Sequence, residues 1–431
     1  MKKLLNIYLI YLLLSLIFLI AAVSVSAQGL TAPMQEEGDA LEIDQLKEYR
    51  EMAWDQWEDT MLDDEILQTE TEEFAMTFGE ATMRYTVDVY GEMPDEGFPL
   101  YIAMHGGGYD DTGDFNDSQW EAMRNYYTDH LDCGVYVAVR GVRDTWDTHF
   151  NPESYPLYDR LIEYMILTEY VDPNRVYLTG FSAGGDGAYA IGARMADRFA
   201  AVNMSSGHPN GISMENYYNL PIELQAGEYD TDFDRNLITA QYGQLLDELQ
   251  SEYPEGYEHR TLIHKDRGHN FEDYSREDVE VYADIDGYLS GGNFRTEWVN
   301  SYAPDWLDDH VRNPLPDSIR WDLSTRAELR ETDAFYYLSA DKDTKGNIQV
   351  YRDGNYMLLA PENLQGDFMI YFNEDMIDFS EPVHFEIADL GELDVMLIPE
   401  ESWLTFTTFD RGDKNYQFEA AVSYNWLLEN L

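Results

Sequence analysis

The most constraining feature of this chain is the segment Gly180-Phe181-Ser182-Ala183-Gly184. The apolar run Arg175 to Thr179 precedes it and predicts a strand, and the small residues Gly185 to Met195 predict a helix after it. A serine held in such a tight strand-to-helix turn has a strained backbone, so that only glycine fits two residues to either side. The segment therefore predicts an exposed, activated Ser182, although the same letters also occur in ordinary turns.

A glycine run follows an earlier predicted strand, Phe98 to Met104, in the order His105-Gly106-Gly107-Gly108-Tyr109. Glycines allow backbone N–H groups to approach a negatively charged oxygen without obstruction from side chains. We expect the N–H groups of Gly106 or Gly107, together with that of Ala183, to form an oxyanion hole. The alternative is a flexible glycine-rich turn.

A carboxylate follows the late strand predicted over Pro221 to Gly227. A residue just beyond the end of a parallel strand can reach a neighbouring catalytic loop, and the third residue after Gly227 is Asp230. Glu228 and Asp232 are the alternatives. The spacing of acidic residues here also resembles a calcium loop, but the glycine and glutamate that such a loop requires are missing.

A histidine completes the set. Arg260 to His264 is predicted as the last strand of the sheet, and His269 lies in the loop that follows it. The chain order Ser182, Asp230, His269 differs from the orders of the chymotrypsin and subtilisin types. His208 is a rival base, but it precedes the acid in the sequence. Tyr109, Trp146 and His149 follow predicted core strands and are candidates for lining a substrate pocket.

Residues 85–289 resemble an α/β-hydrolase of the secreted esterase and polyhydroxybutyrate-depolymerase-like group, which borders on dienelactone hydrolases and prolyl-oligopeptidase-type domains. The resemblance is carried by four segments: His105 to Gly108, Arg143 to Trp146, Asp172 to Val176 and Gly180 to Gly185. It implies the fold and a serine-hydrolase activity through a Ser182–His269–Asp230 triad. The chemistry of such a triad requires no cofactor or metal, and no cluster of residues has the spacing of a zinc site.

The resemblance leaves the substrate open, because one fold hosts many activities. We expect a small-molecule or polymeric carboxylic ester to be cleaved through an acyl-enzyme. A serine peptidase of the prolyl-oligopeptidase type and a polyester depolymerase of the hydroxybutyrate type are the enzymatic alternatives. A non-catalytic binding protein built on the same scaffold is the alternative from another class.

The N-terminus predicts export. A basic Met1-Lys2-Lys3, an apolar run from Leu4 to Val23 and the small residues Val25-Ser26-Ala27 form a secretory signal over residues 1–27, cut after Ala27. The long apolar run leaves an uncleaved membrane anchor as the alternative. Cys133 is the only cysteine, so no internal disulfide can form.

The charge of the chain is strongly acidic, with 84 Asp and Glu against 27 Lys and Arg and a net charge of −57. Such a charge opposes binding to nucleic acids and to anionic membranes. It favours a protein that works in high salt, where counterions screen the repulsion between carboxylates. An ordinary acidic secreted enzyme is the alternative.

Along its 431 residues the chain divides into four predicted parts. The signal is followed by a linker and helical segment at 28–73, in which residues 40–68 carry an apolar stripe expected to pack on the catalytic domain (Leu46, Tyr49, Met52, Ala53 and Trp57). Alternating strands and helices at 74–302 predict a mostly parallel sheet covered by helices on both faces. Short, evenly spaced strands within 303–431, among them Phe335 to Ser339, predict a small C-terminal β-sandwich.

Overall fold

The computed structural model describes residues 30–31, 40–271, 273–292, 295–325, 332–400, 403–404 and 412–431. The predicted signal at residues 1–27 and its cleavage site lie outside these ranges. In the part of the chain that is described, no helix is long and apolar enough to span a membrane.

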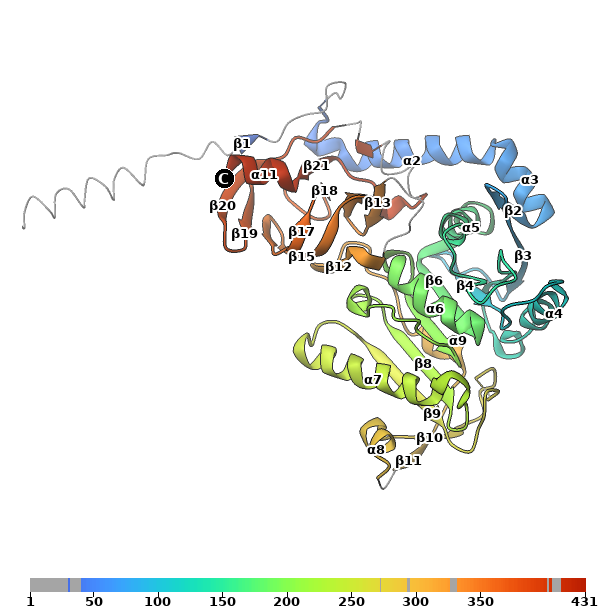
Figure 1. Cartoon of the computed structure of the whole chain (residues 1–431). Coiled ribbons are helices and arrows are strands. Elements are labelled where there is room, and N and C mark those ends of the chain that lie inside the picture. Colours follow the sequence, from blue (N-terminus) through green and yellow to red (C-terminus); the bar gives the residue numbers. More distant parts are fainter. Residues whose placement is uncertain are drawn as a thin grey trace, which may run out of the picture.

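A ten-stranded sheet forms the centre of the described structure, in the order β11-β10-β9-β8-β7-β6-β4-β5-β3-β2 (Figure 1). The six strands β5, β4, β6, β7, β8 and β9 are parallel to one another, and β3 is antiparallel to β5. In chain order the strands are β2 (Ala75–Phe78), β3 (Ala81–Tyr90), β4 (Phe98–Met104), β5 (Gly134–Val139), β6 (Val171–Phe181), β7 (Ala201–Ser205), β8 (Ile222–Gly227), β9 (His259–His264), β10 (Val279–Tyr282) and β11 (Thr296–Val299).

Helices cover both faces of this sheet because its central strands are apolar on both sides. Leu100 and Ile102 of β4 belong to a core shared with buried residues of α5 and α6. Tyr101 and Ala103, which alternate with them, pack into a second core with residues of α4 and α9 on the other face. These helices and α7, which packs on β8 and β9, are α4 (Asp114–Met123), α5 (Ser154–Glu169), α6 (Ala183–Arg194), α7 (Arg235–Glu252) and α9 (Ala303–Asp308). The chain thus has the α/β-hydrolase fold predicted from its sequence.

The prediction that Arg260 to His264 ends the sheet is wrong. Two more strands, β10 and β11, extend the sheet beyond β9, and both pair antiparallel with their neighbours. The helix α8 (Ile285–Ser290) connects them. Both strands have only four residues, of which three are buried in β10 and none in β11, so their sequences lack the continuous apolar run of the central strands.

The helical segment before the sheet consists of α2 (Leu46–Leu62) and α3 (Glu65–Glu73). Its predicted stripe is only partly buried: Leu46 and Trp57 are buried, whereas 61% of Met52 is exposed. Arg50 of α2 pairs with Glu374, Asp375 and Glu419 of the C-terminal part.

The helix α3 contacts the part of the chain that forms the ten-stranded sheet (the α/β part), where Glu70 pairs with Arg160 of α5. Figure 1 shows α2 lying along the C-terminal strands, rather than on the catalytic sheet as expected.

The C-terminal strands, joined by β1 from near the N-terminus, form two further sheets, as the predicted sandwich requires. The seven-stranded sheet has the order β1-β20-β19-β16-β15-β12, with β17 beside β15, and the four-stranded sheet has the order β13-β14-β18-β21. Aromatic rings join the two sheets: Trp321 stacks on Phe335 at 5.3 Å, and Phe372 contacts Phe385 at 6.1 Å. The strands are β1 (Leu30–Thr31), β12 (Ser318–Asp322), β13 (Thr332–Phe335), β14 (Leu338–Asp341), β15 (Lys345–Asp353), β16 (Tyr356–Leu359), β17 (Glu362–Gln365), β18 (Phe368–Phe372), β19 (Val383–Ile387), β20 (Gly391–Met396) and β21 (Ala420–Ser423), and the helix α11 (Tyr424–Asn430) follows.

One predicted C-terminal strand is instead a hairpin. Residues 335–339 divide between β13 and β14, which pair antiparallel around Tyr336 and Tyr337. Tyr336 has a φ of 55°, a left-handed conformation that a strand does not contain. Four large apolar side chains in this segment concealed the turn, because turns are normally recognised by glycine, proline and asparagine.

Short 3₁₀ turns connect many of these elements. They are η1 (Ile43–Gln45), η2 (Thr128–His130), η3 (Ala196–Arg198), η4 (Glu215–Tyr217), η5 (Asp232–Asp234), η6 (Leu323–Thr325) and η7 (Lys414–Tyr416).

A buried ionic cluster connects the part of the chain that holds the two C-terminal sheets (the β part) to the α/β part. Asp413, with 1% of its side chain exposed, accepts from Arg312 at 2.6 Å and lies 3.3 Å from Arg198. Arg312 also donates to the carbonyl oxygen of Asp197 at 2.6 Å. The two parts are therefore held together by charges from which water is excluded.

Candidate active site

Ser182 lies at the end of β6, where the chain turns sharply into α6. Its backbone has φ 59° and ψ −116°, a conformation that is costly for a residue with a side chain. A Cβ atom at Gly180 would come within 2.0 Å of the carbonyl oxygen of Gly184, and one at Gly184 would come within 2.1 Å of that of Met104. Both glycines are therefore required by close approaches of the backbone, and the Ser182 N–H is fixed by the carbonyl oxygen of Ser205 at 2.8 Å.

The structure brings Ser182, His269 and Asp230 into one hydrogen-bonded chain. His269 Nε2 lies 3.0 Å from Ser182 Oγ, and His269 Nδ1 lies 2.9 Å from Asp230 Oδ2. Asp230 has 1% of its side chain exposed, whereas His269 has 37% exposed. The carboxylate is thus shielded from water while the imidazole edge remains open to a substrate.

The loop that carries His269 is held from several sides. The Ser206 hydroxyl donates to the His269 carbonyl oxygen at 2.8 Å, and the Tyr229 N–H donates to the Arg267 carbonyl oxygen at 2.7 Å. A Cβ atom at Gly227 would lie only 2.0 Å from the Gly268 carbonyl oxygen, so the loop can approach the end of β8 this closely only because residue 227 is glycine. The rings of Phe181 and His269 lie 5.2 Å apart, which limits the rotation of the imidazole.

Gly106 of the glycine loop adjoins Ser182, since a Cβ built on Gly106 would lie 3.2 Å from the Ser182 Cβ. The carbonyl oxygens of His105 and Gly106 each accept from a buried imidazole, at 2.9 Å from His149 Nε2 and at 2.6 Å from His105 Nδ1. In a trans peptide the N–H points away from the C=O, so the N–H groups of Gly106 and Gly107 point away from these imidazoles. The N–H of Ala183, in the first turn of α6, has no partner within that helix.

The two imidazoles beneath the loop are neutral. Burial lowers the pKa of His105 to about 4 and that of His149 well below its usual value. Each ring then has one donor and one acceptor nitrogen: His105 Nε2 accepts from the Gly141 N–H at 3.2 Å, and His149 Nδ1 faces the Tyr158 hydroxyl at 3.3 Å. Neutral rings orient the loop without adding a positive charge beside it.

Sequence reasoning missed the side chain that holds the outer end of the glycine loop. Asn116 of α4 accepts from the Gly108 N–H at 2.9 Å and donates to the Gly108 carbonyl oxygen at 2.8 Å. It also donates to Asp144, which pairs with Arg140. A single asparagine on a helix has no distinguishing local pattern, so only its spatial neighbours reveal this role.

The alternative candidates for the catalytic base and acid have other hydrogen-bond partners. His208 accepts from the Asn210 N–H at 3.0 Å, and its own backbone N–H donates to Asp186 at 2.7 Å. Glu228 accepts from the Asp266 N–H at 2.9 Å, and Asp232 is exposed. Hydrogen bonds to His269 therefore single out Asp230 among the acidic candidates.

The three predicted pocket residues have different environments. Tyr109 and Trp146 are 77% and 59% exposed on loops after β4 and β5. His149 is completely buried beneath His105, so its predicted place on a substrate pocket wall is wrong. A histidine in a loop looks the same in the sequence whether it faces solvent or supports the layer above it. Within the described residues, no three His, Cys, Asp or Glu side chains form a metal-binding group.

Comparison with known proteins gives distant matches only. Neither a family model nor a curated protein matches the chain. Among solved structures it is similar to a thermostable esterase, at 22% identity and a TM-score of 0.36, over 56% of this chain and 64% of the other. It is also similar to the poly(3-hydroxybutyrate) depolymerase LpqC from Bordetella parapertussis, at 15% identity and a TM-score of 0.37, over 53% of this chain and 89% of the depolymerase. A third match is the enterobactin esterase of Shigella flexneri, at 20% identity and a TM-score of 0.31, over 44% of this chain and 51% of the esterase.

These proteins are of the kinds that the sequence motifs resemble. The chain spans about two thirds of the length of the thermostable esterase and about half of the enterobactin esterase. Likeness at such identities concerns the fold, so any activity has to be argued from the site itself.

Proposed function

We propose that this chain is a serine hydrolase that cleaves carboxylic esters through Ser182, His269 and Asp230. The observation that carries the proposal is the hydrogen-bonded chain of these three side chains, with its serine at a strained strand-to-helix turn beside a glycine loop. A strained backbone, a buried acid and an accessible imidazole are the arrangement that nucleophilic acyl transfer needs.

In the proposed reaction Ser182 Oγ attacks the ester carbonyl carbon and His269 Nε2 takes the hydroxyl proton. Asp230 holds His269 Nδ1 as a donor and stabilises the imidazolium that forms. The N–H groups of Ala183 and of Gly106 or Gly107 bind the oxyanion, and each such donor contributes roughly 3 to 4 kcal/mol to lowering the barrier. His269 then protonates the leaving alcohol, and a water molecule attacks the acyl-enzyme and releases the acid.

Esters are favoured over peptides by the domain that accompanies the catalytic fold. A gating β-propeller would support a peptidase of the prolyl-oligopeptidase type. Among the described residues, the C-terminal strands instead form one mixed seven-stranded sheet and one antiparallel four-stranded sheet. A substrate panel separates the candidates: short-chain aryl esters, feruloyl and acetyl-xylan esters, hydroxybutyrate oligomers and prolyl amides.

The direct test is labelling with a fluorophosphonate probe, followed by peptide mapping. We expect the label on Ser182, and we expect Ser182→Ala to lose both labelling and turnover while keeping its melting temperature. Ser118→Ala is the control and should keep labelling and turnover, because Ser118 is exposed on α4 and its hydroxyl donates to the Phe115 carbonyl oxygen rather than to the triad. Labelling of another serine, or full turnover by Ser182→Ala, would exclude the proposal.

We further propose that the enzyme is exported and works in high salt. The support is the predicted signal at residues 1–27 and the net charge of −57. The mass of the protein recovered from the medium tests the first point, since cleavage after Ala27 leaves Gln28 as the first residue.

A further inference from the structure

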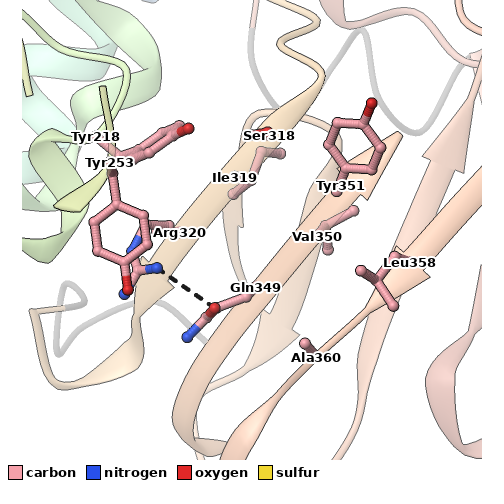
Figure 2. A pocket seen from close by; sticks show the side chains of 10 residues that line it. All are labelled: Tyr218, Tyr253, Ser318, Ile319, Arg320, Gln349, Val350, Tyr351, Leu358 and Ala360. Atoms are coloured by element: carbon pink, nitrogen blue, oxygen red, sulfur yellow. Dashed lines mark hydrogen bonds between the residues drawn. The ribbon is translucent and has the colours of Figure 1, made fainter. Parts of the chain in front are cut away.

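A groove lies where the β part meets the α/β part, and the proposed hydrolysis does not use it (Figure 2). Tyr218 and Tyr253 form the wall on the α/β side, and residues of β12, β15 and β16, with Ala360 after β16, form the other wall. Its volume is about 170 Å³. The residues on the sheet side include Arg320, Gln349 and Tyr351.

The polar groups of the groove are fixed, and the charge of Arg320 is balanced by Glu215. The Arg320 guanidinium lies 4.1 Å from the centre of the Tyr253 ring and pairs with Glu215 at 2.9 Å. Arg320 also donates to Gln349 Oε1 at 3.4 Å, and the Gln349 amide donates to Glu362 at 3.0 Å. The groove thus presents preorganised hydrogen-bonding groups without a net positive charge.

A row of rings continues from the groove across the outer face of the seven-stranded sheet. Tyr351 of β15 is 45% exposed, and its ring lies 6.4 Å from that of Tyr356 on β16. Tyr356 stacks on His384 of β19 at 5.9 Å. The three rings come from three consecutive strands, so the row runs across the strand direction. We call Tyr351, Tyr356 and His384 the ring row.

Carboxylates flank the ring row. Glu386 accepts from the Tyr356 hydroxyl at 2.6 Å, and Asp394 lies 2.8 Å from His384 Nδ1. Both carboxylates are exposed, and each can accept further hydrogen bonds. Their negative charge, within a chain of net charge −57, repels an anionic polymer.

We propose that the groove and the ring row bind a neutral polysaccharide. A sugar ring has an apolar face that packs on an aromatic ring, and its hydroxyl groups donate to carboxylate and amide oxygens. A polyester has the apolar surface but no donors, so binding it would remove water from Glu386 and Asp394 without replacing their hydrogen bonds. The hydrogen-bonding groups therefore select the hydroxyl-rich polymer.

This binding site is separate from the triad. Tyr218 lies before the first residue of β8, whereas Asp230 follows the last residue of the same strand. Six residues of strand cover roughly 20 Å, so the groove lies near the opposite end of the sheet from Ser182. The site would hold a polymer without contacting the bond that is cleaved. Binding of a polysaccharide there does not depend on the proposed esterase activity.

The test uses the full chain in 1 M NaCl with microcrystalline cellulose, insoluble arabinoxylan, mannan and poly(3-hydroxybutyrate) granules. We expect wild type to bind at least one of the three polysaccharides. The double variant Tyr351→Ala with Tyr356→Ala should weaken that binding by about tenfold or more, because aromatic anchors dominate such interfaces. Tyr351→Phe with Tyr356→Phe keeps both rings and should retain most of the binding.

The matched control is Trp298→Ala, which removes an aromatic side chain that is 67% exposed on β11. It should bind the polysaccharide like wild type. Hydrolysis of a soluble aryl ester should be unchanged in the ring-row variants, and Ser182→Ala should still bind the polysaccharide, which separates failure of this inference from failure of the proposed activity. Binding to none of the three polysaccharides, binding to the polyester granules alone, or undiminished binding by the double alanine variant would overturn it.

Discussion

Replacing Asp230 by asparagine tests the proposed chemistry most sharply, because it changes one atom in a buried position. Asp230 Oδ2 lies 2.9 Å from His269 Nδ1, and Oδ1 lies 3.7 Å from the Arg235 guanidinium. A carboxylate only accepts hydrogen bonds, so it fixes Nδ1 as the donor and leaves Nε2 free to take the serine proton.

Asparagine would reverse this arrangement. Its amide oxygen is expected to face Arg235, which only donates, and its NH₂ group then faces His269 Nδ1. The imidazole would turn to the other tautomer, with its proton on Nε2 and directed at Ser182 Oγ. Loss of the correct tautomer in a triad lowers kcat by about 10³ to 10⁴, which corresponds to roughly 4 to 5.5 kcal/mol in the barrier.

The measurement is kcat on a soluble aryl ester, with the melting temperature as the check on folding. Asp232→Asn is the matched control, because Asp232 is two residues away and exposed, and it should keep most of the activity. A loss below about tenfold in Asp230→Asn, or a larger loss in Glu228→Gln, would show that Asp230 does not orient His269.

Three further expectations concern stability. Asp413→Asn should lower the free energy of unfolding by about 3 to 5 kcal/mol in urea titrations, because it leaves the buried Arg312 and Arg198 without their shared carboxylate. The control variant Asp308→Asn removes a half-exposed partner of Arg175 and should lower the free energy of unfolding by less than about 1 kcal/mol. Equal losses in the two variants would show that burial of the cluster does not strengthen it. Burial raises the pKa of Asp273 to about 6, above the value near 3.9 of an unfolded aspartate, so its contribution to the free energy of unfolding is lost as the pH rises from about 4 to about 6. Asp273→Asn should therefore gain stability relative to wild type between pH 4.5 and pH 7.5, and a constant difference in urea midpoint across that range would refute this. The melting temperature should rise steeply between about 0.01 and 1 M NaCl, because the Debye length falls from about 30 Å to about 3 Å and the repulsion among carboxylates is screened; a flat profile would remove the case for a high-salt habitat.

Features that depend on local sterics could be predicted from the sequence. The glycine at position 180 reflects the carbonyl oxygen of Gly184, which lies in the same turn, and the strands β4 and β6 contain the apolar runs that burial of a sheet on both faces requires. These constraints act over a few neighbouring residues, so a short stretch of sequence records them. The α/β-hydrolase fold and the order of its catalytic candidates followed from them.

Features that depend on which surfaces meet were decided by the tertiary structure. Three acidic residues follow β8 within a few positions, and only the approach of the His269 loop distinguishes Asp230 from Glu228 and Asp232. The stripe of α2 is recognisable as amphipathic, but the sequence does not say which sheet it covers, and Arg50 pairs with the C-terminal part. His149 has the same local sequence whether it lines a pocket or supports His105, and packing alone buried it. A side chain's type fixes which interactions it can make, whereas its partners come from segments distant in the chain, and these are brought together only when the whole core packs.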